Sequence, residues 1–292
     1  MKIGNKLKFM ILAPHSWRLS KKYQKLNVLS DDETLDRILA TGCSVARFGD
    51  GEMNIMRGVG IKFQKADDRL KERLLQIAAV GSNENVLVCV PNIFDKEHID
   101  TMTHEAKKWW KNYLRCTRGY WHKLFRGDIF GDTNISRFYM ESKNKDRAGY
   151  VSRLKSLWAD KRLLIVEGMK SRLGMGNDLF ADTQSIKRIL CPSSDAFGMY
   201  DKILNNVNAQ IGTGDFDMMI CALGPTATVL CSDTADKIQS LDLGHIDVEY
   251  EWFLQKANTK CAIENKSVTE VVNDCGDETD SSYREQIIGV IE

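Results

Sequence analysis

The chain has 292 residues, 43% of them hydrophobic, which suffices to bury a large core in one domain or two small ones. Its 41 Lys and Arg residues nearly balance 40 Asp and Glu residues, and the net charge of +1 argues against a dedicated nucleic-acid-binding protein. Eight cysteines occur singly without a CxxC pair, which argues against a zinc site or a disulfide framework and favours reduced core thiols.

The N-terminal apolar run, residues 9–14, is far too short to cross a bilayer, and no later run approaches the roughly 20 residues required. The segment that follows it, His15-Ser16-Trp17-Arg18, does not resemble the small-residue cleavage site of a signal peptide. We therefore expect a cytoplasmic protein without a transmembrane segment and without a nucleic-acid partner.

Short β-branched runs alternate with longer amphipathic stretches along the chain. The runs predict buried parallel strands at 44–48, 85–90, 162–166, 187–191, 217–222 and 238–243. The amphipathic stretches predict helices at 67–80, 100–116, 147–159, 177–186, 196–207 and 226–236. This alternation implies a Rossmann-like α/β fold, with a doubly wound, mostly parallel sheet in a single domain spanning 1–292. We expect its core at about 41–255, an excursion at 118–145 and a polar extension at 258–292, with an exposed loop at 274–282.

Acidic side chains follow the first predicted strand, where Gly49-Asp50-Gly51-Glu52 forms a glycine-bearing turn. In an extended or turning backbone, residues two apart point the same way, so Asp50 and Glu52 are candidate ligands for one divalent cation that holds a diphosphate. Arg47, at the end of the same strand, is a candidate for bidentate contact with a phosphate. The alternative is a polar turn that caps the next helix.

A basic, glycine-bearing loop follows the predicted strand at 162–166 and leads to a predicted helix start. Backbone N–H groups and the helix dipole favour an anion at such a place. A tight turn with solvated basic residues remains the alternative, because the GxG spacing is neither a Walker A loop nor a complete dinucleotide fingerprint. The candidate nucleotide-binding residues here are Glu167, Arg172, Gly174, Asn177 and Asp178.

Small residues end the strand at 217–222 and begin the next helix. Gly224 and Pro225 suit a strand end and a first helical turn, and small side chains let a ligand approach the backbone. Thr226 is a candidate donor to phosphate or ribose oxygens. A well-formed helix start is the alternative interpretation.

One histidine and three acids follow the last predicted strand, in the segment Gly244-His245-Ile246-Asp247-Val248-Glu249-Tyr250-Glu251. His245 and Glu249 share a side whether the segment is extended or helical. The alternative is a solvated acidic helix N-terminus, which the helix dipole favours. Strand C-termini of a parallel sheet meet at one edge, so we expect these four segments to face a common crevice for a phosphorylated, nucleotide-bearing molecule.

Five segments, taken together and in order from about 41 to 253, resemble the GT-D-type glycosyltransferases of bacteria. These are Arg47-Phe48-Gly49-Asp50-Gly51-Glu52, residues 167–180, residues 185–192, Ala222-Leu223-Gly224-Pro225-Thr226-Ala227-Thr228 and residues 244–252. The resemblance implies transfer of a sugar, typically glucose, from a UDP-sugar with a divalent cation, Mn²⁺ before Mg²⁺. Family members extend glycans on serine-rich-repeat adhesins or act in surface-polysaccharide synthesis, which implies a glycan or glycopeptide acceptor.

The resemblance places the metal motif on Asp50 and Glu52 and the catalytic segment on His245, Asp247, Glu249 and Glu251. If the reaction inverts the anomeric centre, a base must activate the acceptor hydroxyl. The sequence leaves that base open among the three carboxylates, with His245 as orienter or second candidate. A nucleotide-diphosphate-sugar hydrolase and a non-catalytic nucleotide-binding module remain alternatives. The donor sugar, the acceptor and the oligomeric state stay open, a homo-oligomer being compatible with the sequence.

Overall fold

The computed structural model describes residues 5–23, 25–267 and 281–292. Eight strands form one sheet in the order β3-β2-β1-β7-β6-β4-β5-β8, and every neighbouring pair is parallel. The strands are β1 Ser44–Arg47, β2 Val86–Val90, β3 Gly131–Asp132, β4 Arg162–Gly168, β5 Ser185–Cys191, β6 Met218–Ala222, β7 Gln239–Asp242 and β8 Ile287–Val290. The predicted doubly wound, parallel α/β fold is confirmed.

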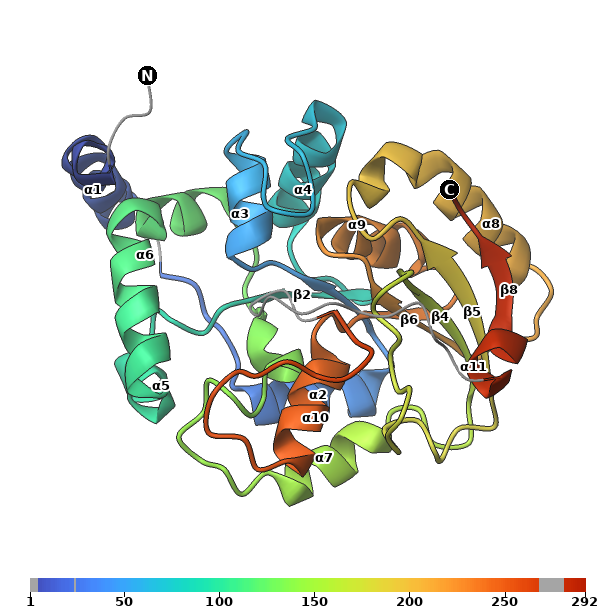
Figure 1. Cartoon of the computed structure of the whole chain (residues 1–292). Helices are drawn as coiled ribbons and strands as arrows, with labels where there is room; N and C mark the ends of the chain where they lie inside the picture. Colours follow the sequence, from blue (N-terminus) through green and yellow to red (C-terminus); the bar gives the residue numbers. More distant parts are fainter. Residues whose placement is uncertain (1–4, 24, 268–280) are drawn as a thin grey trace.

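Helices cover both faces of the sheet (Figure 1). One face is covered by α3 Asp50–Met56, α4 Asp68–Val80, α6 His104–Leu124, α8 Tyr200–Ile211 and α9 Pro225–Thr234. The other is covered by α2 Asp31–Thr41, α7 Ala148–Lys155 and α10 Ile246–Leu254. The remaining helices are α1 Asn5–Lys22, α5 Lys96–Thr101, α11 Ser281–Gln286 and the 3₁₀ turns η1 Thr133–Ser136 and η2 Ala196–Met199.

Side chains alternate between the two faces along each buried strand, as the period of two requires. Ala46 and Val88 belong to the core under α4, α6 and α9, whereas Val45 and Leu87 belong to the core under α2, α7 and α10. None of these four residues is more than 1% exposed. The central strands β1 and β2 are therefore a buried layer, and their polar groups can reach a ligand only at the strand ends.

The chain changes direction across the sheet at the junction of β1 and β7. From β1 it proceeds to β2 and β3 on one side, whereas β7 pairs with β1 on the other, with Val45 opposite Leu241. Loops that leave the carboxyl ends of two such strands diverge and open a crevice. This edge is where the predicted acidic segments after β1 and β7 meet.

The predicted helix at 177–186 is wrong, since residues 177–184 form turns and β5 begins at Ser185. The side-chain Oδ1 of Asn177 accepts a hydrogen bond from Leu179 N at 3.0 Å, and its side-chain Nδ2 donates to carboxylates on α10. Local side-chain hydrogen bonds of this kind favour a turn over a helix. An irregular loop thus connects β4 to β5 in place of the usual crossover helix.

Three other segments differ from the prediction. The helix expected at 100–116 is two helices, α5 and α6, because Thr103 adopts an extended backbone and caps α6 by accepting from Ala106 N at 3.3 Å. The excursion at 118–145 contains the end of α6, then β3 and η1. The polar extension contributes α11 and the edge strand β8, which pairs with β5. Most of the loop expected at 274–282 lies outside the described residues.

None of the helices in the described ranges has the length and apolar character needed to span a bilayer.

Candidate active site

The carboxyl ends of β1 and β7 are joined by Arg47 and Asp242. The Arg47 guanidinium donates from Nε to the Asp242 backbone oxygen at 2.8 Å, from Nη2 to Gly244 O at 3.1 Å and from Nη1 to Thr133 O at 3.3 Å. The buried Asp242 carboxylate accepts in turn from Arg47 N at 3.3 Å and from Thr228 Oγ1 at 3.1 Å. Arg47, predicted to contact a phosphate, therefore fixes the backbone on which the site is built.

Asp50 and Glu52 lie in the first turn of α3, so the extended or turning backbone that would point both side chains the same way is wrong. Two residues of helix rotate by about 200°, so the two side chains leave the backbone in nearly opposite directions. Glu52 turns back and accepts the Gly49 N–H at 2.7 Å, the capping role that the sequence allowed as an alternative. Asp50 is exposed, and its backbone oxygen accepts from Tyr113 Oη of α6 at 3.3 Å.

Both carboxyls have raised pKa values. Burial raises the pKa of Glu52 to about 7, and the negative charge of Asp242 adds to the effect. Asp50 reaches solvent, but the protein atoms around it desolvate it enough to raise its pKa, which the Arg137 charge partly offsets. A cation at this edge would lower both pKa values, because positive charge favours the ionised carboxylate.

Glu249 is the fully buried member of the C-terminal acidic segment. Its Oε2 accepts two backbone N–H groups, from Met140 at 2.8 Å and from Tyr139 at 3.0 Å. Its Oε1 is buried and has no hydrogen-bond partner among the described residues. Burial raises the Glu249 pKa to about 7. Glu249 therefore combines an unsatisfied oxygen with a pKa near neutrality, the property expected of a general base.

Arg137 and Glu141 connect Asp50 with Glu249, and the sequence analysis missed both. The Arg137 charge lowers and the Glu141 charge raises the pKa of each of the other two carboxyls, so all four charged groups share one electrostatic environment. Glu141 Oε2 accepts from Trp110 Nε1 of α6 at 3.3 Å, and its Oε1 lies 4.0 Å from Arg137 Nη1. The sequence does contain one sign of this pair, since two oppositely charged residues stand four positions apart within the segment predicted as an excursion.

Asp247 and Glu251, the other two acids of α10, form a network with Lys266. Lys266 Nζ lies 2.8 Å from Asp247 Oδ2 and 2.9 Å from Glu251 Oε1, and the lysine is 1% exposed. Asn177 Nδ2 donates to both carboxylates at 2.8 Å, and Gly174 N donates to Asp247 at 2.9 Å. Asp247 is buried and Glu251 is partly buried, so neither is a freely solvated acid, and both bind the β4–β5 loop to α10.

Glu167 is a buried partner of Arg188. The Arg188 Nη1 lies 2.6 Å from Glu167 Oε1, which also accepts from Tyr283 Oη at 2.9 Å, while Leu173 N donates to Oε2 at 2.8 Å. Arg188 also donates from Nε to Gln286 at 2.7 Å. Glu167 therefore holds the edge of the sheet to α11, a contact that the sequence analysis did not anticipate.

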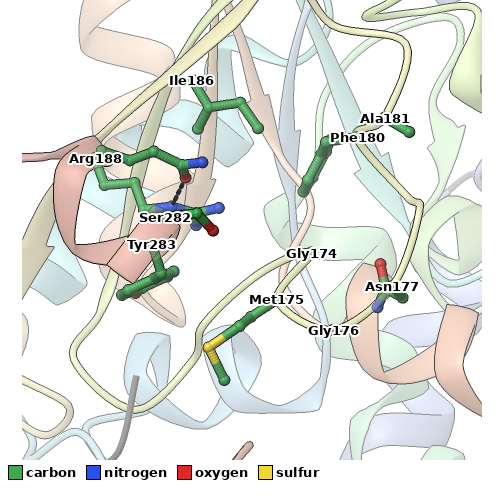
Figure 2. A pocket seen from close by; sticks show the side chains of 11 residues that line it. Gly174, Met175, Gly176, Asn177, Phe180, Ala181, Ile186, Arg188, Ser282 and Tyr283 are labelled. Atoms are coloured by element: carbon green, nitrogen blue, oxygen red, sulfur yellow. Dashed lines mark hydrogen bonds between the residues drawn. The ribbon is translucent and has the colours of Figure 1, made fainter. Parts of the chain in front are cut away.

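A cavity of about 400 Å³ lies beside this pair (Figure 2). Arg188 and Tyr283 line one side of it, and Gly174 and Asn177, two of the predicted nucleotide-binding residues, line the other. Arg172, in the same loop, is buried and donates from Nη1 to Asn265 O at 2.8 Å. The lining of this cavity includes neither Asp50 nor Glu249.

Gly224, Pro225 and Thr226 lie where β6 meets α9. Gly224 has φ of +55°, and a Cβ at this position would come within 2.5 Å of the Phe63 ring, so a larger residue would displace the ring. Thr226 Oγ1 is buried and has no hydrogen-bond partner among the described residues. Because this hydroxyl is buried, a ligand can reach it only if the atoms around it shift.

His245 and Asp178 are the remaining predicted site residues. His245 directly precedes α10 with φ of +74°, and its backbone oxygen accepts the Glu249 N–H at 2.9 Å. Asp178 is exposed and accepts from Tyr250 Oη at 2.6 Å and Lys155 Nζ at 3.0 Å, contacts that lower its pKa. Over the ranges that the structure describes, no group of three or more His, Cys, Asp or Glu side chains is arranged to hold a metal ion.

Comparison with known proteins gives matches along most of the chain. Residues 45–271 match the family described as glycosyltransferase GT-D fold. The chain is 39% identical, over 91% of its length, to a probable glycosyl transferase Gly of Streptococcus gordonii. It is 36% identical, over 94% of its length, to the glycosyltransferase GlyD of Streptococcus pneumoniae. It spans 39% of the length of the first relative and 33% of the second.

Two solved structures are similar over nearly the whole chain. One, described as a new glycosyltransferase from Streptococcus sanguinis, is 38% identical with a TM-score of 0.87, covering 92% of this chain and 100% of that one. The other, described as the domain of unknown function 1792 with a distinct glycosyltransferase fold, is 37% identical with a TM-score of 0.88, covering 95% and 100%.

Proposed function

Because the chain belongs to the GT-D glycosyltransferase family, we propose that it transfers a hexose, glucose in the first instance, from a UDP-sugar to a hydroxyl group of a glycan acceptor. The observation that carries the proposal is the Glu249 carboxylate, with its unsatisfied oxygen and a pKa near 7, in one electrostatic environment with Asp50. A glycan on a surface glycoprotein or a polysaccharide provides such an acceptor.

The residues at the N-terminus of α3 fit a divalent cation that shares its ligands with a diphosphate. Mg²⁺ and similar hard cations bind one or two carboxylates together with substrate phosphates and water, and so do not require three protein ligands. Asp50 is exposed and Glu52 retains Oε1 beyond its bond to Gly49. We propose that Asp50 binds Mn²⁺ or Mg²⁺ directly and that Glu52, whose side chain turns back to the start of the helix, binds the same cation through water. The cation would supply positive charge that stabilises the departing UDP.

Glu249 is the best-placed base among the three acids that the sequence left open. Asp247 and Glu251 are bound by Lys266 and Asn177, whereas Glu249 Oε1 has no partner in the described chain. In the proposed step Glu249 accepts the proton of the acceptor hydroxyl, whose oxygen bonds to the anomeric carbon as the bond to UDP breaks, with inversion. Because Glu249 is fully buried, the proposal requires the 137–141 segment to move when the acceptor binds.

The test is transfer of labelled glucose from UDP-glucose to a short glycopeptide, with Mn²⁺ or with chelator. We expect Asp50→Ala to lower turnover by at least about 100-fold, the scale of removing a charge-stabilising group from an active site. Asp236→Ala, at an exposed acid after α9, is the matched control and should retain activity. Full activity of Asp50→Ala, or full activity in chelator, contradicts the metal assignment. Release of glucose at the same rate without acceptor would indicate a hydrolase.

A further inference from the structure

The near-zero net charge of the chain conceals a strongly basic helix pair. The sequences of α1 and α6 contain 11 of the 41 Lys and Arg residues but only one of the 40 Asp and Glu residues, Glu105. The two helices lie together at one end of the molecule (Figure 1). The rest of the chain is correspondingly acidic, so the charge is separated in space.

The two helices are fixed to each other by a close crossing. Gly119 of α6 donates its N–H to Ser16 Oγ of α1 at 3.0 Å, and a Cβ on Gly119 would lie 2.2 Å from Ser16 O. Only glycine permits this approach, so α1 and α6 form one rigid unit. The positions of the two helices relative to each other are therefore fixed at this crossing.

The outer face of this unit combines unpaired positive charge with exposed tryptophan. On α6, residues three and four apart share a face, and its exposed cations are Lys108, Lys111 and Arg115, with the exposed Glu105 one turn before Lys108. On α1, the corresponding exposed residues are Arg18, Lys21 and Lys22. None of these six has an acidic partner within 4.0 Å in the described part of the chain.

Trp17 and Trp109, beside these cations, are 59% and 46% exposed. Lys21 Nζ lies 3.8 Å from the centre of the Trp17 ring, and one side of the Trp109 ring stacks on Tyr113 with 5.1 Å between the ring centres. A binding surface for a soluble polyanion requires only the positive charge. Exposed indoles beside lysines are the residues that enter the interface of a membrane, where the ring sits at the level of the headgroups. We propose that the outer face of α1 and α6 docks on a bilayer that contains anionic phospholipid, without spanning it.

The opposite face of α6 contacts the candidate active site. Trp110 and Tyr113 point inward, to Glu141 and to the backbone of Asp50 respectively. Docking through the outer face would thus place the Asp50–Glu249 edge one helix away from the lipid surface. The docking itself does not depend on the proposed function, because lipid binding is measured without turnover.

Co-sedimentation of the chain with lipid vesicles tests the proposal. Vesicles of phosphatidylcholine with about one third phosphatidylglycerol should bind the chain, and pure phosphatidylcholine vesicles should not, since each basic residue near an anionic surface contributes about 1 kcal/mol. We expect the double variant Lys108→Glu/Lys111→Glu to bind at least about tenfold more weakly. The control Lys202→Glu/Lys256→Glu reverses two exposed lysines on other elements and should bind as the unchanged chain does.

Tryptophan separates lipid from other polyanions. Trp109→Ala should weaken vesicle binding severalfold and leave heparin binding unchanged, whereas Val80→Ala, at a residue 67% exposed on α4, should change neither. Circular dichroism confirms that each variant is folded. Tight binding to heparin or polyuridylate with no binding to anionic vesicles overturns the proposal. Equal vesicle binding by Lys108→Glu/Lys111→Glu and its control overturns it as well.

Discussion

The acidic edge at β1, α3 and α10 and the exposed basic residues of α1 and α6 differ in the sign of their charge and in their surroundings. The acids of the edge are mostly buried, whereas the basic residues face water. Asp242, Asp247 and Glu249 are at most 3% exposed. Asp242 accepts a hydrogen bond from Thr228, and Asp247 forms an ion pair with Lys266. Glu249 has one bonded oxygen and one oxygen without a partner among the described residues. Lys108, Lys111 and Arg115 are exposed to water. A buried charge affects folding and chemistry through its neighbours, whereas an exposed charge acts mainly on what approaches from solution.

The largest effect expected from this contrast is on turnover. Glu249→Gln removes the proposed base but retains the side-chain volume and an oxygen for the N–H groups of Tyr139 and Met140. We expect kcat to fall about 10²- to 10⁴-fold, the usual contribution of general base catalysis, with UDP affinity unchanged by calorimetry. Glu97→Gln, at an exposed acid of α5, is the control. If turnover and UDP affinity fall together, Glu249 has a structural role and the base lies elsewhere.

The next effect is on stability. Lys266→Met leaves the carboxylates of Asp247 and Glu251 without their buried cation, and breaking a buried pair in this way costs about 3–5 kcal/mol. Urea denaturation measures the loss. Lys256→Met, at an exposed lysine after α10, should cost less than about 0.5 kcal/mol. Similar losses for the two variants would show that the Lys266 network contributes no more than an exposed charge.

The sheet was predictable because its strands are short apolar runs whose pattern depends on burial alone. All six predicted strands exist, and the two missed strands are β3, which has two residues, and β8, at the polar end of the chain. The loop at 177–184 was not predictable, because its turns depend on Asn177 meeting α10 across 70 or more residues. Sequence spacing carries no information about such a distant partner.

The candidate site likewise has residues that could be predicted from the sequence and residues whose roles could not. The acids after β1 and β7 could be found because they follow strands, and parallel strands end at one edge. The roles of Arg47 and Glu167 could not, since each is decided by a partner from another strand or helix, Asp242 in one case and Arg188 in the other. Arg137 and Glu141 were missed because opposite charges at i,i+4 spacing are their only mark in a segment with neither a helical nor a strand period.

The last prediction concerns the pH dependence of stability. The pKa of Glu249 is about 7 in the folded chain against an ordinary value of 4.5, so between these values the folded chain binds more protons than the unfolded chain. The free energy of unfolding therefore falls as the pH rises through this window, by about 3 kcal/mol for a shift of this size. Urea denaturation from pH 4.5 to 8 measures the fall, and Glu249→Gln should remove this share of it while the share of Glu52 remains. Lys108→Glu/Lys111→Glu should leave the slope unchanged, because exposed side chains have nearly the same surroundings in both states. If the free energy of unfolding falls equally with pH in Glu249→Gln and in the unchanged chain, the pKa of Glu249 is not raised by its surroundings. Glu249 would then titrate as an exposed acid does, and burial would not distinguish it from the exposed charged residues.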